Sequence, residues 1–136
     1  MSEQARKALL VPAGEGRAYN MGRMSAVFKA DEGETGGRYS ISEWRLEPRT
    51  RGPGEHSHGD DHVFHVLEGT LGLCLDGAWS SLDAGGYAIV PGGTPHDFRN
   101  ESDAPARFIS LNLPGGFEAR MPDIEAALSA EDLALD

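Results

Sequence analysis

Histidine is the residue type whose spacing in this sequence most plainly suggests chemistry. Four of the five histidines fall in two groups, with His56, His58 and His62 close together and His96 further along the chain. In an extended segment, residues two apart project from the same face, so His56 and His58 can reach one point. His62 follows a turn-prone Gly-Asp-Asp triplet and can enter the next strand on the side that it shares with Phe64.

His96 follows a rigid Pro-Gly-Gly-Thr-Pro reversal that would deliver it at the head of another strand. Neutral imidazole is the commonest protein ligand for transition metals. Any one of these histidines alone is more simply a surface or hydrogen-bonded core residue. Converging inside one barrel, however, four uncompensated bases would repel one another or leave polar atoms unpaired. The set therefore predicts a site for one divalent transition metal (zinc, nickel, iron, manganese or copper) ligated by His56, His58, His62 and His96.

The elements that must position these histidines are predicted to be short strands. Eighteen glycines and eight prolines divide the chain, and almost no segment before residue 117 shows a helical repeat of apolar residues. Residues 38–47 alternate, with Ser40, Ser42, Trp44 and Leu46 sharing one face. The expected strands cover residues 18–29, 38–47, 62–67, 70–75, 78–82, 87–90, 96–100 and 107–113. Many short strands at close spacing predict an all-β sandwich or barrel.

The chain after residue 117 has a different pattern. Pro122 suits the first turn of a helix, and Ile124, Ala127, Leu128 and Leu135 can form one apolar stripe. We expect one or two short C-terminal helices packed outside the barrel. The length suits a single domain over residues 1–136, with a core over about residues 20–115 and a helical tail over about residues 117–135.

Two segments resemble the paired motifs of the cupin superfamily. Residues 54–69 read Gly-Glu-His-Ser-His-(x3)-His-(x6)-Gly, which is similar to the first motif, and residues 85–100 read Gly-(x5)-Pro-x-Gly-(x2)-His-(x3)-Asn, which is similar to the second. The spacing resembles that of small single-domain quercetin-dioxygenase-like cupins. The resemblance implies a double-stranded β-helix, also called a jelly-roll barrel, and makes His56, His58 and His96 metal ligands.

The resemblance has one departure, because His62 stands where cupins usually carry a glutamate. A neutral imidazole in place of a carboxylate leaves the metal's charge less compensated, so the metal should be a stronger Lewis acid. The change also removes a candidate base. Polyketide-cyclase-like cupins with four histidines, whose metal acts without redox change, are similar to this sequence at those four positions.

These observations predict a metal-dependent enzyme, dioxygenase-like, that acts on a small oxygenated organic molecule. Two alternatives remain open: a non-redox, zinc-type cyclase, isomerase or lyase, and a non-catalytic cupin module that binds a metal and a ligand. The sequence assigns no catalytic residue beyond the metal ligands and no organic cofactor.

Net charge and cysteine content limit the binding partners and the cellular compartment that we expect. A formal net charge of −10 disfavours nucleic acid and anionic membranes as partners, and no apolar stretch reaches the length of a membrane span. Cys74 is the only cysteine, so no internal disulfide is expected and the cytoplasm is the predicted location. By analogy with the fold, strand-edge pairing into a homodimer is expected.

Bulky apolar side chains on one barrel face are candidates to line a pocket, although most of them are expected to be simply core. They are Trp44, Leu46, Phe64, Leu71, Leu73, Phe98 and Leu111. Polar groups that could reach a substrate, although an exposed strand position suits each better, are Tyr39, Tyr87, Glu43, Arg45 and Arg107. Asp60 and Asp61 could orient a ligand imidazole, although a turn role is simpler. His65 has the opposite parity to His62 and should point away from the metal, as a surface or subunit-contact residue.

Overall fold

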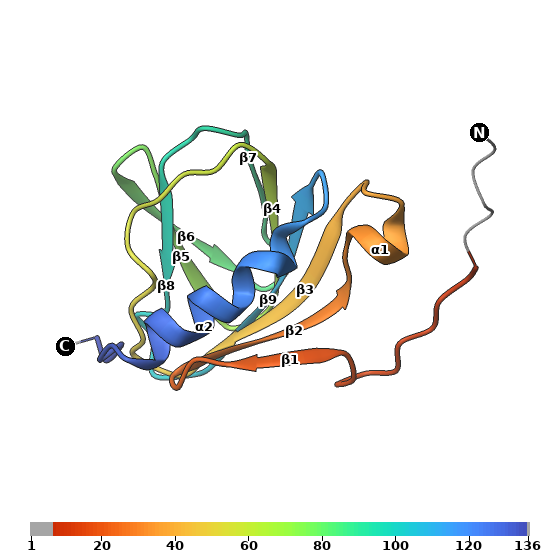
Figure 1. Ribbon diagram of the computed structural model, residues 1–136. Coiled ribbons are helices and arrows are strands. Elements are labelled where there is room, and N and C mark those ends of the chain that lie inside the picture. The colour runs from red at the N-terminus through yellow and green to blue at the C-terminus, as the bar shows by residue number, and fades with distance from the viewer. Residues whose placement is uncertain (1–6, 136) are drawn as a thin grey trace.

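Two antiparallel sheets face each other in the computed structural model, which describes residues 7–135 (Figure 1). The larger sheet has six strands in the order β1-β2-β3-β9-β4-β7, and the smaller has three in the order β6-β5-β8. The strands are β1 (Arg17–Asn20), β2 (Met24–Ala30), β3 (Ser40–Leu46), β4 (Asp61–Glu68), β5 (Thr70–Leu75), β6 (Ala78–Asp83), β7 (Tyr87–Val90), β8 (His96–Arg99) and β9 (Ala106–Leu113). The predicted all-β jelly-roll class is confirmed, with two facing sheets rather than one continuous hydrogen-bonded barrel.

The alternation of β3 explains how the larger sheet forms. Ser40, Ser42, Trp44 and Leu46 are all buried, whereas the residues between them face outward. β3 pairs with β2 on one side and β9 on the other, so this buried face is continued across the sheet. The aromatic rings of Trp44 and Phe108 stack at a centroid distance of 6.3 Å in the resulting core.

The prediction of one strand over residues 18–29 is wrong. The structure has a turn between β1 and β2, in which the backbone N–H of Met21 donates to the carbonyl of Met24 at 2.9 Å. Gly22 adopts a φ of 85°, which glycine reaches without strain, and its N–H donates to the side chain of Asn20. Asn20 and Gly22, which are turn-favouring residues in the middle of this stretch, are the sequence signal for the reversal.

A short helix, α1 (Glu32–Thr35), also lies outside the predicted elements. The backbone N–H of Asp31, the residue that precedes the helix, donates to the carboxylate of Glu34 at 2.8 Å. This bond satisfies a backbone donor at the helix start.

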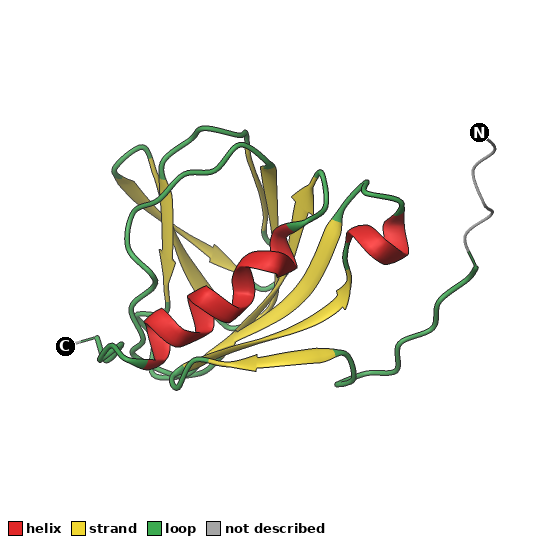
Figure 2. Ribbon diagram, viewed as in Figure 1, coloured by secondary structure: helices red, strands yellow, loops and turns green. Residues whose placement is uncertain are grey.

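The predicted C-terminal helices are present as η1 (Phe117–Arg120) and α2 (Met121–Ser129), with Pro122 in the first turn of α2. Figure 2 shows this helical segment, in red, running across the front of the strands. Leu128 is buried, but Leu135 lies beyond the helix, so its predicted place in the helical stripe is wrong. In residues 7–135 no helix has both the length and the apolar character that crossing a bilayer requires.

Candidate metal centre

Three separate segments bring the histidines together. His56 and His58 lie on the connection between β3 and β4, His62 is on β4, and His96 opens β8. The backbones of His56 and His96 exchange two hydrogen bonds, of 3.0 and 2.8 Å, which hold the connection against the start of β8.

Glycine allows the two histidine-bearing loops to pack closely. A Cβ at Gly92 would lie 2.2 Å from the carbonyl oxygen of Gly59, a distance that no side chain tolerates. Next to it, the N–H of Gly93 donates to the carbonyl of His58 at 2.8 Å. The Pro-Gly-Gly reversal therefore positions the first loop as well as His96.

His56, His58 and His96 can each offer a ring nitrogen within 4.8 Å of the other two. Their other ring nitrogens face oxygen atoms: Nδ1 of His56 is 2.7 Å from the Gly54 carbonyl, and Nδ1 of His96 is 2.8 Å from the Thr94 carbonyl. Oxygen acceptors at Nδ1 favour the tautomer that carries its proton there, so the Nε2 lone pair is free to bind a metal.

Nδ1 of His58 lies 3.0 Å from Oδ1 of Asp60, and the same tautomer is favoured. The Nε2 atoms of His58 and His96 are buried and have no hydrogen-bond partner within residues 7–135. An unpartnered buried nitrogen is costly, and a cation between the two rings would satisfy both. The donor set therefore fits a divalent transition metal.

His62 stands beside this group of three, with its ring centroid 5.5 Å from those of His58 and His96. Its Nε2 lies 2.6 Å from the hydroxyl of Ser110, which in turn lies 3.5 Å from Oδ1 of Asn112. Nε2 is thus engaged with Ser110, and Nδ1 is the ring nitrogen of His62 that is open to a metal. That Nδ1 atom is buried without a hydrogen-bond partner in the described part of the chain.

Asp60 links the surroundings of two of these histidines. It is 8% exposed, faces Nδ1 of His58 through Oδ1, and accepts the Asn112 amide through Oδ2 at 2.9 Å. Through Asn112 and Ser110 it also connects to His62. Of the two roles considered for Asp60, orientation of a ligand imidazole is the one that these contacts favour.

Asp61 has the simpler of the two roles considered for it, because its carboxylate accepts the N–H of Gly92 in a turn. His65 is exposed on the outer face of β4, as its parity predicted, with Nδ1 3.2 Å from the Gly86 carbonyl.

Electrostatics keep two of these imidazoles neutral. Burial lowers the pKa of His62 well below its ordinary value of 6.5, and the neighbouring His96, His58 and His56 lower it further. Burial also lowers the pKa of His96, which the Thr94 carbonyl offsets in part. Both rings therefore retain a lone pair at neutral pH, which is the form that binds metals.

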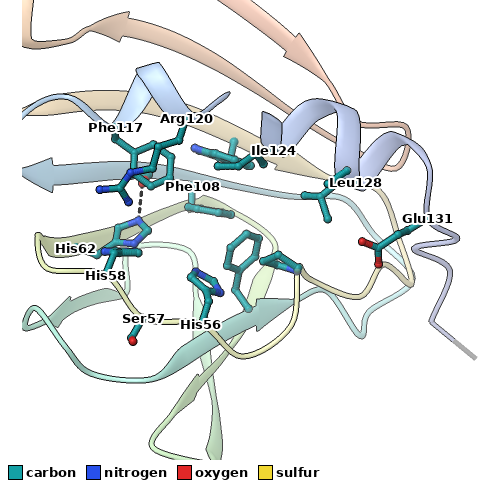
Figure 3. A pocket seen from close by; sticks show the side chains of 15 residues that line it. His56, Ser57, His58, His62, Phe108, Phe117, Arg120, Ile124, Leu128 and Glu131 are labelled. Carbon is teal, nitrogen blue, oxygen red and sulfur yellow. Dashed lines mark hydrogen bonds between the residues drawn. The ribbon is translucent and has the colours of Figure 1, made fainter. Parts of the chain in front are cut away.

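A cavity of about 360 Å³ opens beside the histidines, between the sheets and the C-terminal helical segment (Figure 3). Its lining consists of Trp44, Pro53, His56, Ser57, His58, His62, Phe98, Phe108, Ser110, Phe117, Arg120, Ile124, Ala127, Leu128 and Glu131. Trp44 and Phe98 line it as predicted. The cavity therefore places apolar and aromatic surface next to the candidate ligands.

Five of the seven lining candidates do not line the cavity, and four of them belong to the core, as expected for most of the set. Leu46, Phe64, Leu71 and Leu73 are fully buried core residues instead. Leu111 lies on the opposite face of β9 from the buried Phe108, Ser110 and Asn112. The inward face of β9 is partly polar because Ser110 and Asn112 belong to the histidine network.

The polar strand residues weighed for substrate contact lie elsewhere. Tyr39, Tyr87 and Arg45 are exposed, and Arg107 pairs with Glu43 and Glu68 on the outer face of the larger sheet. The exposed-strand interpretation is therefore the correct one for all of them.

Sequence reasoning missed the contribution of the C-terminal segment to the cavity. Phe117, Arg120, Ile124, Leu128 and Glu131 all line it. The sequence placed these helices outside the barrel and carried no signal that they close a pocket. Ser110 and Asn112 did carry a signal, because they are polar residues at the parity of Phe108.

Comparison with known proteins gives a family for this architecture. The model of the family described as the cupin domain matches residues 42–112. Quercetin 2,3-dioxygenase of Bacillus subtilis (strain 168) is 36% identical over 111 residues, which is 78% of this chain, and the match spans 31% of that protein's length.

Among solved structures, KdgF from a Halomonas species has a TM-score of 0.72 at 16% identity, covering 83% of this chain and 99% of that one. An RmlC-like cupin from Shewanella frigidimarina has a TM-score of 0.69 at 16% identity, covering 85% and 99%. These two likenesses bear on the fold alone. The family match covers more than half of the chain and includes all four histidines, and the protein therefore belongs to the cupin family.

Proposed function

We propose that His56, His58, His62 and His96 hold one divalent transition metal. The observation that carries this proposal is the set of buried ring nitrogens without hydrogen-bond partners: Nε2 of His58, Nε2 of His96 and Nδ1 of His62. Each belongs to a ring whose other nitrogen faces an oxygen atom. This pairing of one oriented and one open nitrogen is the usual arrangement of metal-binding histidines.

We further propose that the protein is a metal-dependent enzyme, dioxygenase-like, that acts on a small oxygenated organic molecule. The bound metal would polarise a substrate oxygen and, if it is redox-active, support oxidation by dioxygen. Trp44, Phe98 and Phe108 would exclude water from the adjacent cavity. The identity to a quercetin 2,3-dioxygenase supports the oxidative assignment.

A specific observation favours a second candidate, a non-redox cyclase, isomerase or lyase of the zinc type. His62 stands at the position of the usual cupin glutamate, and its Nε2 is engaged with Ser110. His62 is thus not free to act as a base, and among residues 7–135 no carboxylate lines the histidine end of the cavity. Chemistry that depends only on Lewis acidity needs no such carboxylate.

Elemental analysis combined with oxygen uptake separates these functions. The dioxygenase-like proposal predicts iron, nickel, manganese or copper in the purified protein and oxygen consumption with phenolic or enolic compounds. Zinc with no oxygen consumption, but with conversion of such compounds, would replace it with the non-redox candidate. Metal binding without turnover of any kind would indicate a non-catalytic module.

A further inference from the structure

The cavity beside the histidines contains a single lysine or arginine side chain, Arg120, the last residue of η1. Its guanidinium carbon lies 5.3 Å from the centre of the Phe117 ring. Figure 3 shows it on the same side of the cavity as His58 and His62. Most of the remaining lining is apolar, and the carboxylate of Asp60, which pairs with Arg120, does not line the cavity.

Two sets of contacts place Arg120 at the histidine end of the cavity. Its Nη2 is 3.6 Å from Oδ1 of Asp60, the atom that lies 3.0 Å from Nδ1 of His58. The Phe117 ring beneath it is 6.0 Å from the ring of His58. A group bound at the histidines would therefore be near the guanidinium.

The donors of Arg120 are available. Nη2 of Arg120 forms an ion pair with Oδ1 of Asp60 at 3.6 Å, which is beyond hydrogen-bond distance, and the Arg120 side chain makes no hydrogen bond to the described residues. By contrast, the side chain of Arg51 is bound through Nε and both terminal nitrogens. A free guanidinium fork next to apolar surface is suited to bidentate binding of an oxyanion.

The other end of the cavity has no comparable free charge. Glu131 lines it, but its carboxylate is paired with Arg51 at 2.9 Å. Arg120 thus lines the histidine end while its partner Asp60 does not, apolar side chains line the middle, and at the far end Glu131 is paired with Arg51. A ligand with an anionic head and an apolar tail would fit in one orientation only, with its head toward the histidines.

We propose that Arg120 determines the specificity of this site by binding an oxyanion, such as a carboxylate or enolate, that is carried on an apolar body. The proposal deepens the proposed function, on which it rests for the place of the metal. A cavity of about 360 Å³ is at the lower end of the range for small-molecule sites, so the body is of the size of one substituted ring.

The test compares cinnamate with cinnamamide, which have the same shape but differ in charge. Isothermal titration calorimetry measures both with the full chain, once after chelation and once loaded with zinc. We expect wild-type protein to bind cinnamate about tenfold to a hundredfold more tightly than cinnamamide in both forms, since a charge-assisted contact is lost with the amide.

In the chelated protein, where no metal can bind the carboxylate, Arg120→Met should remove this preference, mainly by weakening the binding of cinnamate. The matched control is Arg45→Met, which removes the same charge from the outer face of β3, and it should keep the preference. If Arg120→Met does not fold, Arg120→Gln is measured in its place, and the same loss of preference for cinnamate is expected.

Three results with the chelated protein would overturn the inference: equal affinities in the wild type, no binding of cinnamate up to roughly 10 mM, or a preference that survives in the Arg120 variant. Zinc measurements keep the two proposals apart. If zinc fails to bind but the Arg120-dependent preference is present, the proposed metal site is wrong and the inference stands. If zinc binds and the preference does not depend on Arg120, only the inference fails.

Discussion

At the scale of single residues, the site is a set of imidazoles whose orientation is fixed from outside. Oxygen atoms from Gly54, Thr94 and Asp60 face Nδ1 of three rings, and Ser110 faces Nε2 of His62. His56, His58 and His96 offer ring nitrogens within 4.8 Å of one another, and like bases in close contact are unfavourable without a cation. The proposed metal would account for this arrangement.

Asp60→Asn tests the role of the orienting carboxylate. The amide lacks the negative charge that faces Nδ1 of His58 at 3.0 Å, so zinc affinity should fall about tenfold to a hundredfold. Competition with a chromophoric chelator measures the affinity. Asp61→Asn is the matched control, because Asp61 serves only the turn at Gly92 and its variant should keep the wild-type value. Equal affinities for the two variants would show that Asp60 does not orient the ligands.

The place of His62 in the ligand set can be tested against the neighbouring His65. His62→Ala should weaken zinc binding at least about tenfold, because it removes the nitrogen proposed as the fourth ligand. His65→Ala removes an exposed imidazole from the other face of β4 and should leave zinc binding unchanged. If both variants bind zinc as the wild type does, His62 is not a ligand and the site consists of three histidines.

Buried neutral histidines also make the metal-free protein sensitive to acid. The folded-state pKa of His62 and of His96 is below the value of about 6.5 expected in the unfolded chain. Below that pH the unfolded state binds more protons, so stability is full above about pH 6.5 and is lost as the pH falls. The Tm of chelated protein should drop between about pH 6.5 and 5. His62→Phe should show a smaller drop, and an unchanged pH profile in that variant would contradict this account.

At the scale of elements, the pattern of apolar and turn residues predicted the bounds of strands well. The alternation of residues along a strand predicted its inward face less well. The bounds of β5 and β7 were predicted without error, because turn residues flank short apolar runs. Leu111 was assigned to the wrong face of β9, since an apolar residue was preferred inward although Ser110 and Asn112 are there. Polar residues that serve a site reverse the usual pattern, so parity alone cannot predict them.

The cavity-forming role of the C-terminal segment could not be predicted because it depends on contacts distant in sequence. Glu118 is 9% exposed and binds Arg17 and Tyr19 of β1, at 2.8 and 2.7 Å, across about a hundred residues of chain. Asp31 accepts the backbone N–H of Glu118 at 3.1 Å. These partners fix η1 and thereby set the position of Arg120 and Phe117 over the cavity.

Glu118→Gln should loosen this attachment. The loss of charged hydrogen bonds to a largely buried carboxylate is expected to lower the free energy of unfolding by about 1–2 kcal/mol. Urea denaturation measures the change. Glu101→Gln, which removes an exposed pairing with Arg99, should cost less than about 0.5 kcal/mol. A Glu118 variant as stable as the Glu101 variant would show that the contact does not anchor the segment.

At the scale of the whole molecule, two facing sheets and one helical segment enclose the histidines and the cavity (Figure 1). The cupin motifs predicted this architecture and the convergence of His56, His58 and His96. They could not predict the ligand, because the cavity is completed by a segment outside the motifs. The single domain over residues 1–136, the homodimer and the cytoplasmic location stay predictions.

The metal content of the purified protein tests the central claim most directly. Elemental mass spectrometry should find about one transition-metal ion per chain in the wild type and much less in His58→Ala and His96→Ala. Each variant removes a buried ring nitrogen that has no hydrogen-bond partner within residues 7–135. His65→Ala should match the wild type. Unchanged metal content in both His58→Ala and His96→Ala would contradict the account.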